Sequence, residues 1–561
     1  MFKYIYTTII TLLALGSQAQ ETVPLTTASD TSATDTLTEL KKIEVDEVEV
    51  IKAFEVKLGE AKRIAVGPKL QKVTPVKKEY KYDITIVPAD IEYPDPVIKP
   101  LAMNPDPQPH VDHFYAKLGY GTYKSPYADV SYYNLVPELY SFTIDAHHYG
   151  FDNSAEDINQ KVQETELNLA GDYLLGENNI IGLDLNGSLS NRNLKEPQAV
   201  PPAELDFNRQ VINLGGKLHF KNAETNNNGL NYNAYIGVQH LEVSDNKLLV
   251  DKGNEEQDMT AGGSVMKKIG DDFRIKLSAD AYYNTIHIDT ASAGVFTTEL
   301  APGILYNKGI FSVAAAADLI LDENGLSPWV DTELGVEVTP GIQVYVGADQ
   351  ELMRNNLIST LDRNPYVLLD STFQENSISK KIFGGVRGVV LNKLSFDISG
   401  AYEDISNQYY FTDISNFSTF DVAYQDVKNI AIDANIEFKL SETVSIGGSL
   451  SQNIFDPSET EELTNIPSYH YEAFAKTALL NKKLHIKGGL ALSDKVFYQD
   501  GLGQLVSGKA LTDISVEVDY YITNNIAVWA RGNNLLNQSY ERFEGYNILG
   551  LNANGGVIVK F

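Results

Sequence analysis

The stretch NIAIDANIEFKL, residues 429–440, decides the fold, because it alternates apolar and polar side chains almost without a break. One face would carry Ile430, Ile432, Ala434, Ile436, Phe438 and Leu440, and the other Asp433, Asn435, Glu437 and Lys439. A period of two indicates a β-strand whose faces meet different surroundings. The same alternation returns in KLSFDISGAY (393–402), KLHIKGGL (483–490) and SVEVDY (515–520). The sequence therefore predicts an all-β protein from His113 onward.

The connections between these strands alternate between tight turns and long loops. Tight ones include LLGENN (174–179), TPG (339–341), LNK (391–393) and ITNN (522–525), whereas 195–206, 245–257 and 354–375 are long and polar. Short turns at one rim and long loops at the other are typical of outer-membrane barrels. Residues 113–561 are thus expected to form a transmembrane antiparallel β-barrel of about 22 strands, within a range of roughly 20 to 22. Its last strand is expected to run from Asn547 to Phe561.

In such a barrel the apolar face of each strand meets lipid, and the polar face lines the lumen. The residues predicted to face the lumen are Glu333, Glu337, Asp397, Asp433, Glu437, His485, Lys487, Glu517 and Asp519. Because most of them are acidic, the lumen is expected to favour cations or neutral solutes over anions.

The first 112 residues differ from the rest. MFKYIYTTIITLLALGSQAQ resembles a secretory signal peptide cut after Ala19, which would leave residues 20–112 as a periplasmic extension with a disordered tail, short strands and a proline-rich connector at 88–109. There is no cysteine, which excludes a lipoprotein anchor, disulfides and thiolate metal sites. These features predict the outer membrane of a Gram-negative bacterium as the location.

The extension contains a basic strip, residues 61–81, with the cations Lys62, Arg63, Lys69, Lys72, Lys77, Lys78 and Lys81. Residues 20–112 hold 12 Lys and Arg against 17 Asp and Glu, while 113–561 hold 32 against 58. A tethered basic strip has a high effective concentration at the mouth of an acidic barrel. We expect part of Ala61–Lys81 to dock there and obstruct the pore, although a solvated strip that meets another envelope component is the alternative.

The C-terminal segment NNLLNQSY (533–540) is expected to carry the next-to-last strand to the outer rim, and it also carries a family resemblance. Asn534, Leu535, Asn537 and Tyr540 match the N-L-x-(N/D)-x-x-Y pattern near the next-to-last strand of TonB-dependent receptors, and a final strand ending in Phe561 is typical of a barrel-insertion signal. The resemblance implies a barrel of about 22 strands for solute uptake. Receptors of that family carry a plug, for which residues 20–112 are too short, so the chain resembles a plugless relative. Inward loops, the extension or a partner protein would then fill the lumen.

Little in the sequence indicates catalysis. GQLVSGKA (503–510) lacks the hydroxyl residue of a phosphate-binding loop at Ala510, and HVDH (110–113) is an incomplete metal set. Asp251, Glu255, Glu256 and Asp258 fall in one predicted outer loop, where Ca²⁺ could bind, but a solvated acidic loop is the plainer interpretation. We expect no enzyme and no cofactor, and the formal charge of -30 argues against nucleic acid as a partner.

Two functions remain open on the sequence. The first is a plugless receptor-type barrel that binds or admits a solute across the outer membrane. The second is a non-transporting barrel subunit of a larger outer-membrane complex for barrel assembly or secretion. The expected partners are outer-membrane lipid and lipopolysaccharide, the barrel-assembly machinery, and an envelope protein that fills or caps the lumen.

Overall fold

The computed structural model describes residues 112–153, 160–194, 207–223, 226, 228–246, 254–288, 291–369, 376–413, 419–499 and 504–561. The predicted signal peptide, the predicted extension up to residue 111 and its basic strip lie outside the described residues. Within the described part of the chain, no helix is long and apolar enough to cross a membrane.

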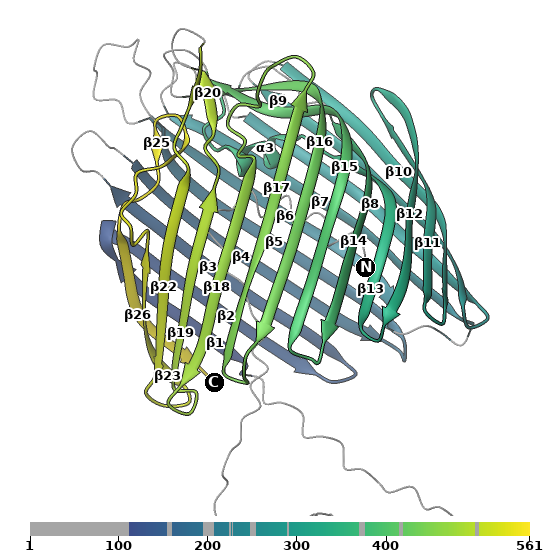
Figure 1. Ribbon diagram of the computed structural model, residues 1–561, viewed down its shortest axis with the longest axis horizontal. Helices are drawn as coiled ribbons and strands as arrows, with labels where there is room; N and C mark the ends of the chain where they lie inside the picture. The colour runs from purple at the N-terminus through teal and green to yellow at the C-terminus, as the bar shows by residue number, and fades with distance from the viewer. Residues whose placement is uncertain are drawn as a thin grey trace, which may run out of the picture. The chain divides into compact units, whose positions relative to one another are not determined.

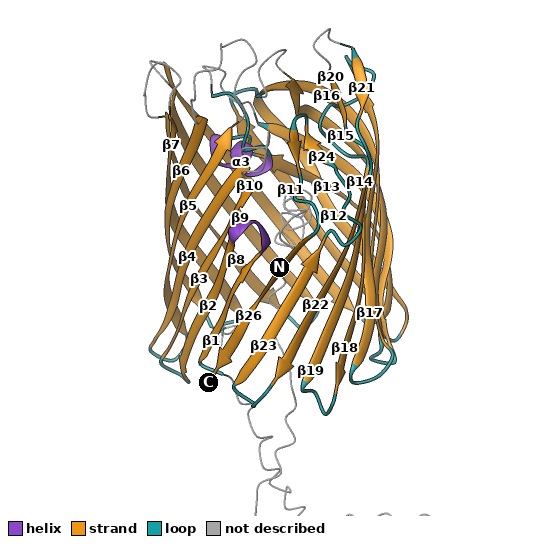
Figure 2. Ribbon diagram, turned by 90° about the vertical axis from the view of Figure 1, so that its left-hand side faces the viewer, coloured by secondary structure: helices purple, strands orange, loops and turns teal. Residues whose placement is uncertain are grey.

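The described chain forms a closed antiparallel barrel of 22 strands, which confirms the predicted fold class (Figures 1 and 2). Consecutive wall strands pair, and the first strand also pairs with the last, which closes the ring. The wall strands are β1 (Phe114–Gly121), β2 (Ser125–Val136), β3 (Tyr140–Asn153), β4 (Gln160–Leu175), β5 (Asn179–Leu194), β6 (Phe207–Asn222), β7 (Leu230–Asn246), β8 (Asn254–Ile269), β9 (Phe273–Ile288), β10 (Ala291–Lys308), β11 (Phe311–Asp322), β12 (Gly325–Thr339), β13 (Ile342–Met353), β14 (Ser377–Val390), β15 (Leu394–Asp413), β16 (Phe420–Lys439), β17 (Val444–Pro457), β18 (Tyr469–Leu479), β19 (Leu484–Ser493), β22 (Leu511–Tyr521), β23 (Ile526–Asn533) and β26 (Asn552–Lys560).

A few short elements lie outside this wall. They are the 3-10 turn η1 (Thr122–Lys124), helix α3 (Leu357–Arg363), and the hairpins β20 (Phe497–Gln499) with β21 (Leu505–Ser507) and β24 (Glu541–Phe543) with β25 (Tyr546–Asn547). All but η1 belong to long connections at the rim opposite the tight turns.

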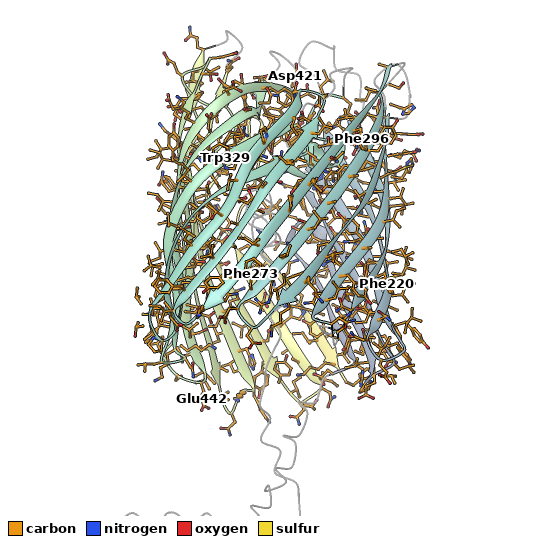
Figure 3. The ribbon with its side chains drawn as sticks, turned by 90° about the vertical axis from the view of Figure 1, so that its right-hand side faces the viewer. Phe220, Phe273, Phe296, Trp329, Asp421 and Glu442 are labelled. Carbon is orange, nitrogen blue, oxygen red and sulfur yellow. The ribbon has the colours of Figure 1, made fainter. Side chains whose placement is uncertain are left out.

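The tight turns and both ends of the wall share one rim. The amide of Phe114 donates to the carbonyl of Phe561 at 2.8 Å, and the amide of Phe561 donates back at 3.0 Å. Glu442, in the turn after β16, lies at this lower rim in Figure 3, and Asp421, at the start of β16, lies at the upper rim. An even number of strands returns the chain to its starting side, so the lower rim is the periplasmic one.

Sequence explains the tight turns locally. Gly309 has φ 59° in the turn between β10 and β11, and Asn392 has φ 53° in the turn between β14 and β15. Tight hairpin turns of this kind need positive φ, which Gly and Asn adopt at the lowest cost.

The outer face of the barrel is apolar. Side chains on the outward positions remain exposed despite their hydrophobicity, for example Ile432 at 42% and Phe296 at 55%. Aromatic residues lie near both ends of this face, and Figure 3 shows Phe296 high and Phe220 low on the wall. An apolar band between aromatic girdles, around a barrel without a free edge, is the surface of an outer-membrane protein. The chain is therefore an outer-membrane β-barrel.

The wall is much lower on one side than on the other. Strands β1, β23 and β26, where the ring closes, are about half as long as β15 and β16. The segment NNLLNQSY was predicted to carry the next-to-last strand to the outer rim, and that prediction is wrong: β23 ends at Asn533, and the last strand begins at Asn552 rather than Asn547. The residues between them leave the wall and fold over its low side.

Candidate functional site

The long connection between β13 and β14 turns into the barrel. We call its described segment Arg354–Leu369 the lumen strap. Both ribbon views place α3, which belongs to the strap, inside the upper part of the barrel (Figures 1 and 2). The side chain of Asn356 caps α3 by accepting from the amide of Ser359 at 2.9 Å, and Leu357 and Leu361 then fall on one buried face.

The first part of the strap is bound to carboxylates on the lumen side of β8. The guanidinium of Arg354 donates to both oxygens of Asp258 at 2.7 and 2.9 Å, and stacks 4.2 Å from the ring centre of Tyr282 on β9. The amide of Leu357 donates to the carboxylate of Glu256. Since Glu256 is 0% and Asp258 3% exposed, these bonds form away from solvent, where their loss would be costly.

A second polar anchor holds the end of the strap. Arg209 on β6, 1% exposed, makes a bidentate pair with Asp245 on β7 at 2.7 Å for each bond. Its remaining nitrogen donates to the carbonyls of Pro365 at 3.0 Å and Val367 at 2.7 Å. One fully buried guanidinium thus joins two wall strands to the backbone of the strap.

An apolar layer lies between these anchors. Leu357 and Leu361 pack on Leu241 and Val243 of β7, all at most 7% exposed. Inward-facing positions of a barrel lumen are ordinarily polar. Here they form a hydrophobic core with a helix.

The strap also contacts the wall formed by β15 and β16. The amide of Leu368 donates to the carbonyl of Phe420 at 2.7 Å, and the amide of Phe420 donates to the carbonyl of Tyr366 at 3.3 Å, so Val367 and Phe420 form a short parallel bridge. Tyr366 and Val367 then join a buried cluster of mainly aromatic side chains, whose other members are Tyr409, Phe411, Phe420, Phe543 and Tyr546.

The last two members come from the hairpin β24–β25, which we call the inner hairpin. Tyr546 stacks on Tyr366 with ring centres 3.5 Å apart and planes 15° apart, and Phe543 meets Tyr366 edge-on at 5.9 Å. Burial raises the pKa of the Tyr366 hydroxyl and lowers the pKa of the neighbouring Arg542 guanidinium. Both shifts have the direction expected where water is largely excluded.

The family-like motif explains how the inner hairpin reaches this cluster. Asn534 and Asn537 adopt positive φ of 45° and 51°, which turns the chain off the wall directly after β23. The Asn534 side chain, 2% exposed, donates to the carbonyls of Gln538 and Leu549 at 2.8 and 2.9 Å, and Asn537 accepts from the amide of Leu551 at 2.9 Å. Tyr540 is buried. The motif therefore folds a loop instead of extending a strand.

The wall regions that hold these inward segments are spread around the ring. The strap binds β6–β8 and then β15–β16, and β7 and β15 stand eight places apart among 22 strands. The inner hairpin enters between the last two strands, on the low side of the wall. The strap and the inner hairpin thus meet in the outer half of the lumen, and three separate regions of the wall hold them there.

The residues predicted for the lumen lie on the strand faces opposite the exposed apolar side chains. Several are paired with cations: Arg387 bonds Glu333 at 2.5 Å, and both Lys117 and Arg531 bond Glu517. Asp397 accepts from the hydroxyl of Tyr345 at 2.8 Å. Such pairing reduces the negative field that the sequence indicates.

The other predicted lumen residues make local contacts or line the wall. Glu337 accepts from the amide of Gly341 at 2.9 Å, and the His485 ring lies 2.8 Å from the carbonyl of Lys482. Asp433 and Glu437 lie on β16, Lys487 on β19 and Asp519 on β22.

The acidic group predicted for one outer loop is not gathered there. Glu255, Glu256 and Asp258 lie on β8, where Glu255 faces away from the other two, and Asp251 lies outside the described residues. The strand alternation separates them, and Glu256 and Asp258 bind the strap. Among the described residues no group of three or more His, Cys, Asp or Glu is arranged to hold a metal ion.

The other weak motifs also have structural roles. Asp112 pairs with Lys560 at 3.2 Å, while His113 contacts the carbonyl of Tyr133 at 2.9 Å. In GQLVSGKA, Leu505–Ser507 form β21 of a short hairpin, without the helix that a phosphate-binding loop precedes.

The strap could not be predicted as a site from the sequence. Asn355 and Asn356 before Leu357 give a capping signal, and Leu357 and Leu361 have helical spacing. A single helical turn in a loop does not indicate which way the loop folds. Its partners Arg209, Glu256 and Asp258 are distant in sequence.

Comparisons with known proteins bear on the fold. No protein-family model and no curated protein sequence matches the chain. Its structure is similar to the ferric-catecholate import receptor Fiu of E. coli K12, with a TM-score of 0.61 at 9% identity over 80% of this chain and 82% of that one. It is also similar to the ferric enterobactin receptor PfeA of Pseudomonas aeruginosa (0.62, 11%, 80% and 80%) and the iron transporter FrpB of Neisseria meningitidis (0.62, 10%, 80% and 82%). The chain therefore has the 22-strand barrel fold of the TonB-dependent receptors of the outer membrane.

Proposed function

We propose that this protein is an outer-membrane barrel that binds a solute and admits it across the outer membrane. The observation that carries the proposal is the closed ring of 22 strands, whose lumen face is polar and ion-paired while its outer face is apolar. A barrel of this size encloses a lumen wide enough for an aqueous path or a folded obstruction. The similar structures named as import receptors and transporters support a solute as the cargo.

The plugless character belongs to the same proposal. In it, the segments that obstruct the lumen come from the outer connections of the barrel, and the cargo approaches from the cell surface. No catalytic step is proposed.

The second candidate is a scaffold subunit of a larger envelope assembly. The aromatic cluster of the strap, β15, β16 and the inner hairpin favours it, because segments that pack into a buried core suit a barrel that does not conduct. In that case the outer loops or the periplasmic side would hold a protein partner.

The two candidates separate in one set of experiments. The protein is purified from native membranes and reconstituted into liposomes, and flux of graded neutral sugars is measured for the wild type and for a barrel whose strap is replaced by a flexible linker. Solitary purification with solute flux through the wild type supports the uptake barrel, and the replaced barrel serves only as the reference for an open lumen. Stoichiometric co-purification with an envelope protein, without flux through the wild type, would overturn it and favour the scaffold.

A further inference from the structure

We infer that the lumen strap, Arg354–Leu369, is this chain's own closure of the barrel, so that the permeability barrier lies in the outer half of the lumen and is latched to the wall by two chemically different contacts. The inference concerns the barrier and does not depend on whether a solute is transported.

The strap contacts wall strands far from the two that it connects. It joins the outer ends of β13 and β14, but its contacts include β6–β9 and β15–β16. A loop that served only to join neighbouring strands would have no need to reach across the barrel. Together with the inner hairpin, the strap occupies the region through which a solute would have to pass.

The strap takes part in a buried aromatic cluster. Its members Tyr366, Val367, Phe420, Phe543 and Tyr546 are no more than 7% exposed, and they come from the strap, the upper end of β16 and the inner hairpin. Burying a large apolar side chain contributes about 1.5–3 kcal/mol. A buried aromatic core inside a lumen excludes water and ions, which is what a barrier requires.

The two latches differ in their chemistry. On β6–β8 the strap is held by Arg209 and Asp258, whose charges are buried and paired, and by Glu256, which accepts from the amide of Leu357. On β15–β16 it is held by aromatic packing and two backbone hydrogen bonds. A buried ion pair is stable when complete and strongly destabilised when one partner is removed, so the charged latch can be released by a single substitution.

Planar-bilayer conductance tests the inference. Residues 356–367 are replaced by a Gly/Ser linker of equal length, and heat-modifiable migration establishes that the barrel has folded. The wild type should show little conductance, and the replaced barrel should conduct on the order of tenfold more, as expected for an unobstructed lumen of this strand number. A folded, replaced barrel that conducts no more than the wild type would overturn the inference, as would a wild type that already conducts at the level of the replaced barrel.

A redox test uses the absence of cysteine from the chain. Val367→Cys and Phe420→Cys are introduced at the parallel bridge in a barrel that also carries Arg209→Gln, which weakens the charged latch. The reduced protein should conduct, and oxidation should return it to the wild-type level, because the disulfide refastens the strap. Val367→Cys with Arg209→Gln is the matched control and should not respond to oxidation. Equal conductance of the oxidised and reduced forms, with the disulfide shown by mass spectrometry, would contradict the closure.

Discussion

Ile432 and Asn435 stand three residues apart on β16 but face different surroundings. Ile432 is 42% exposed on the outer face, within the apolar run that extends from Ile430 to Phe438. Ile432→Arg should destabilise the assembled barrel by about 2–4 kcal/mol, because the charge would lie in hydrocarbon. Denaturant unfolding in lipid vesicles measures the difference.

Asn435→Arg is the matched substitution on the lumen side of the same strand. It should be tolerated, since the lumen face already holds paired charges. Equal losses of unfolding free energy in both variants would contradict the assignment of the lipid and lumen faces. A larger loss in Asn435→Arg would mean that the two faces are exchanged.

Arg209 is the residue on which the charged latch depends most. Arg209→Gln removes one partner of a buried ion pair and leaves the Asp245 carboxylate and two strap carbonyls without their donor. The loss of stability should be about 3–5 kcal/mol, and most of it should destabilise the bound strap rather than the barrel wall. Hydrogen exchange of the strap amides should therefore accelerate by roughly a hundredfold or more.

Arg387→Gln is the control for this prediction. Arg387 is also a lumen arginine, and its guanidinium donates to Glu333 on β12 and Gln343 on β13. Its substitution should leave strap exchange unchanged. Unaltered exchange in Arg209→Gln as well would mean that aromatic packing alone holds the strap.

The same residues mark the limit of reasoning from sequence. Glu256 and Asp258 were interpreted as a solvated acidic loop, because the chain around them is polar and acidic. Their true environment is set by Arg354 and by the amide of Leu357, about a hundred residues away. Local pattern gives the face of a strand but not its distant partner.

At the scale of elements, alternation was sufficient for the strands of the wall and insufficient for the segments that leave it. NIAIDANIEFKL lies in β16, and the predicted tight turns fall between wall strands. The segment at Asn534 was predicted to continue the next-to-last strand to the outer rim, whereas Asn534 and Asn537 bend the chain by their positive φ. Asparagine readily adopts positive φ, and the prediction of a continuous strand did not take this into account.

The seam between β1 and β26 is the element that closes the ring, and Phe561 sits at its end. The Phe561 ring stacks on Phe114 with centres 4.9 Å apart, and it is 62% exposed. Deleting Phe561 removes two terminal backbone hydrogen bonds and one aromatic stacking contact. The other residue pairs between β1 and β26 remain. The finished barrel should therefore remain folded, while its insertion becomes slower because the terminal aromatic is lost.

The appearance of the heat-modifiable form over time measures this insertion. Phe561→Tyr keeps an aromatic ring at the same place and should insert at the wild-type rate. If the deletion inserts as fast as the wild type, the last residue is not an insertion signal. If it never yields a folded band, the seam depends on Phe561 for stability.

At the scale of the whole molecule, charge divides the chain into two unequal parts. Residues 113–561 hold 32 Lys and Arg against 58 Asp and Glu, whereas residues 61–81 are strongly basic. The predicted docking of Ala61–Lys81 at the periplasmic mouth concerns residues outside those that the structure describes, and it stays a prediction. A barrel closed by the strap in its outer half would remain closed whether or not the extension is present. The docking of the basic strip is therefore tested in a barrel whose strap has been replaced.

Deletion of residues 20–100 should accordingly leave the conductance of the wild-type barrel low. In the barrel with the replaced strap, the same deletion should raise conductance further, because the basic strip would no longer obstruct the acidic lumen from the periplasmic side. The obstruction should weaken with salt, since the Debye length falls from about 10 Å at 0.1 M to about 3 Å at 1 M. Replacing Lys62, Arg63, Lys69, Lys72, Lys77, Lys78 and Lys81 by Gln keeps the length of the tether and should have the same effect as the deletion. Identical conductance with and without the extension, at low salt and with the strap replaced, would mean that the basic strip does not enter the pore and that the strap is the barrier on its own.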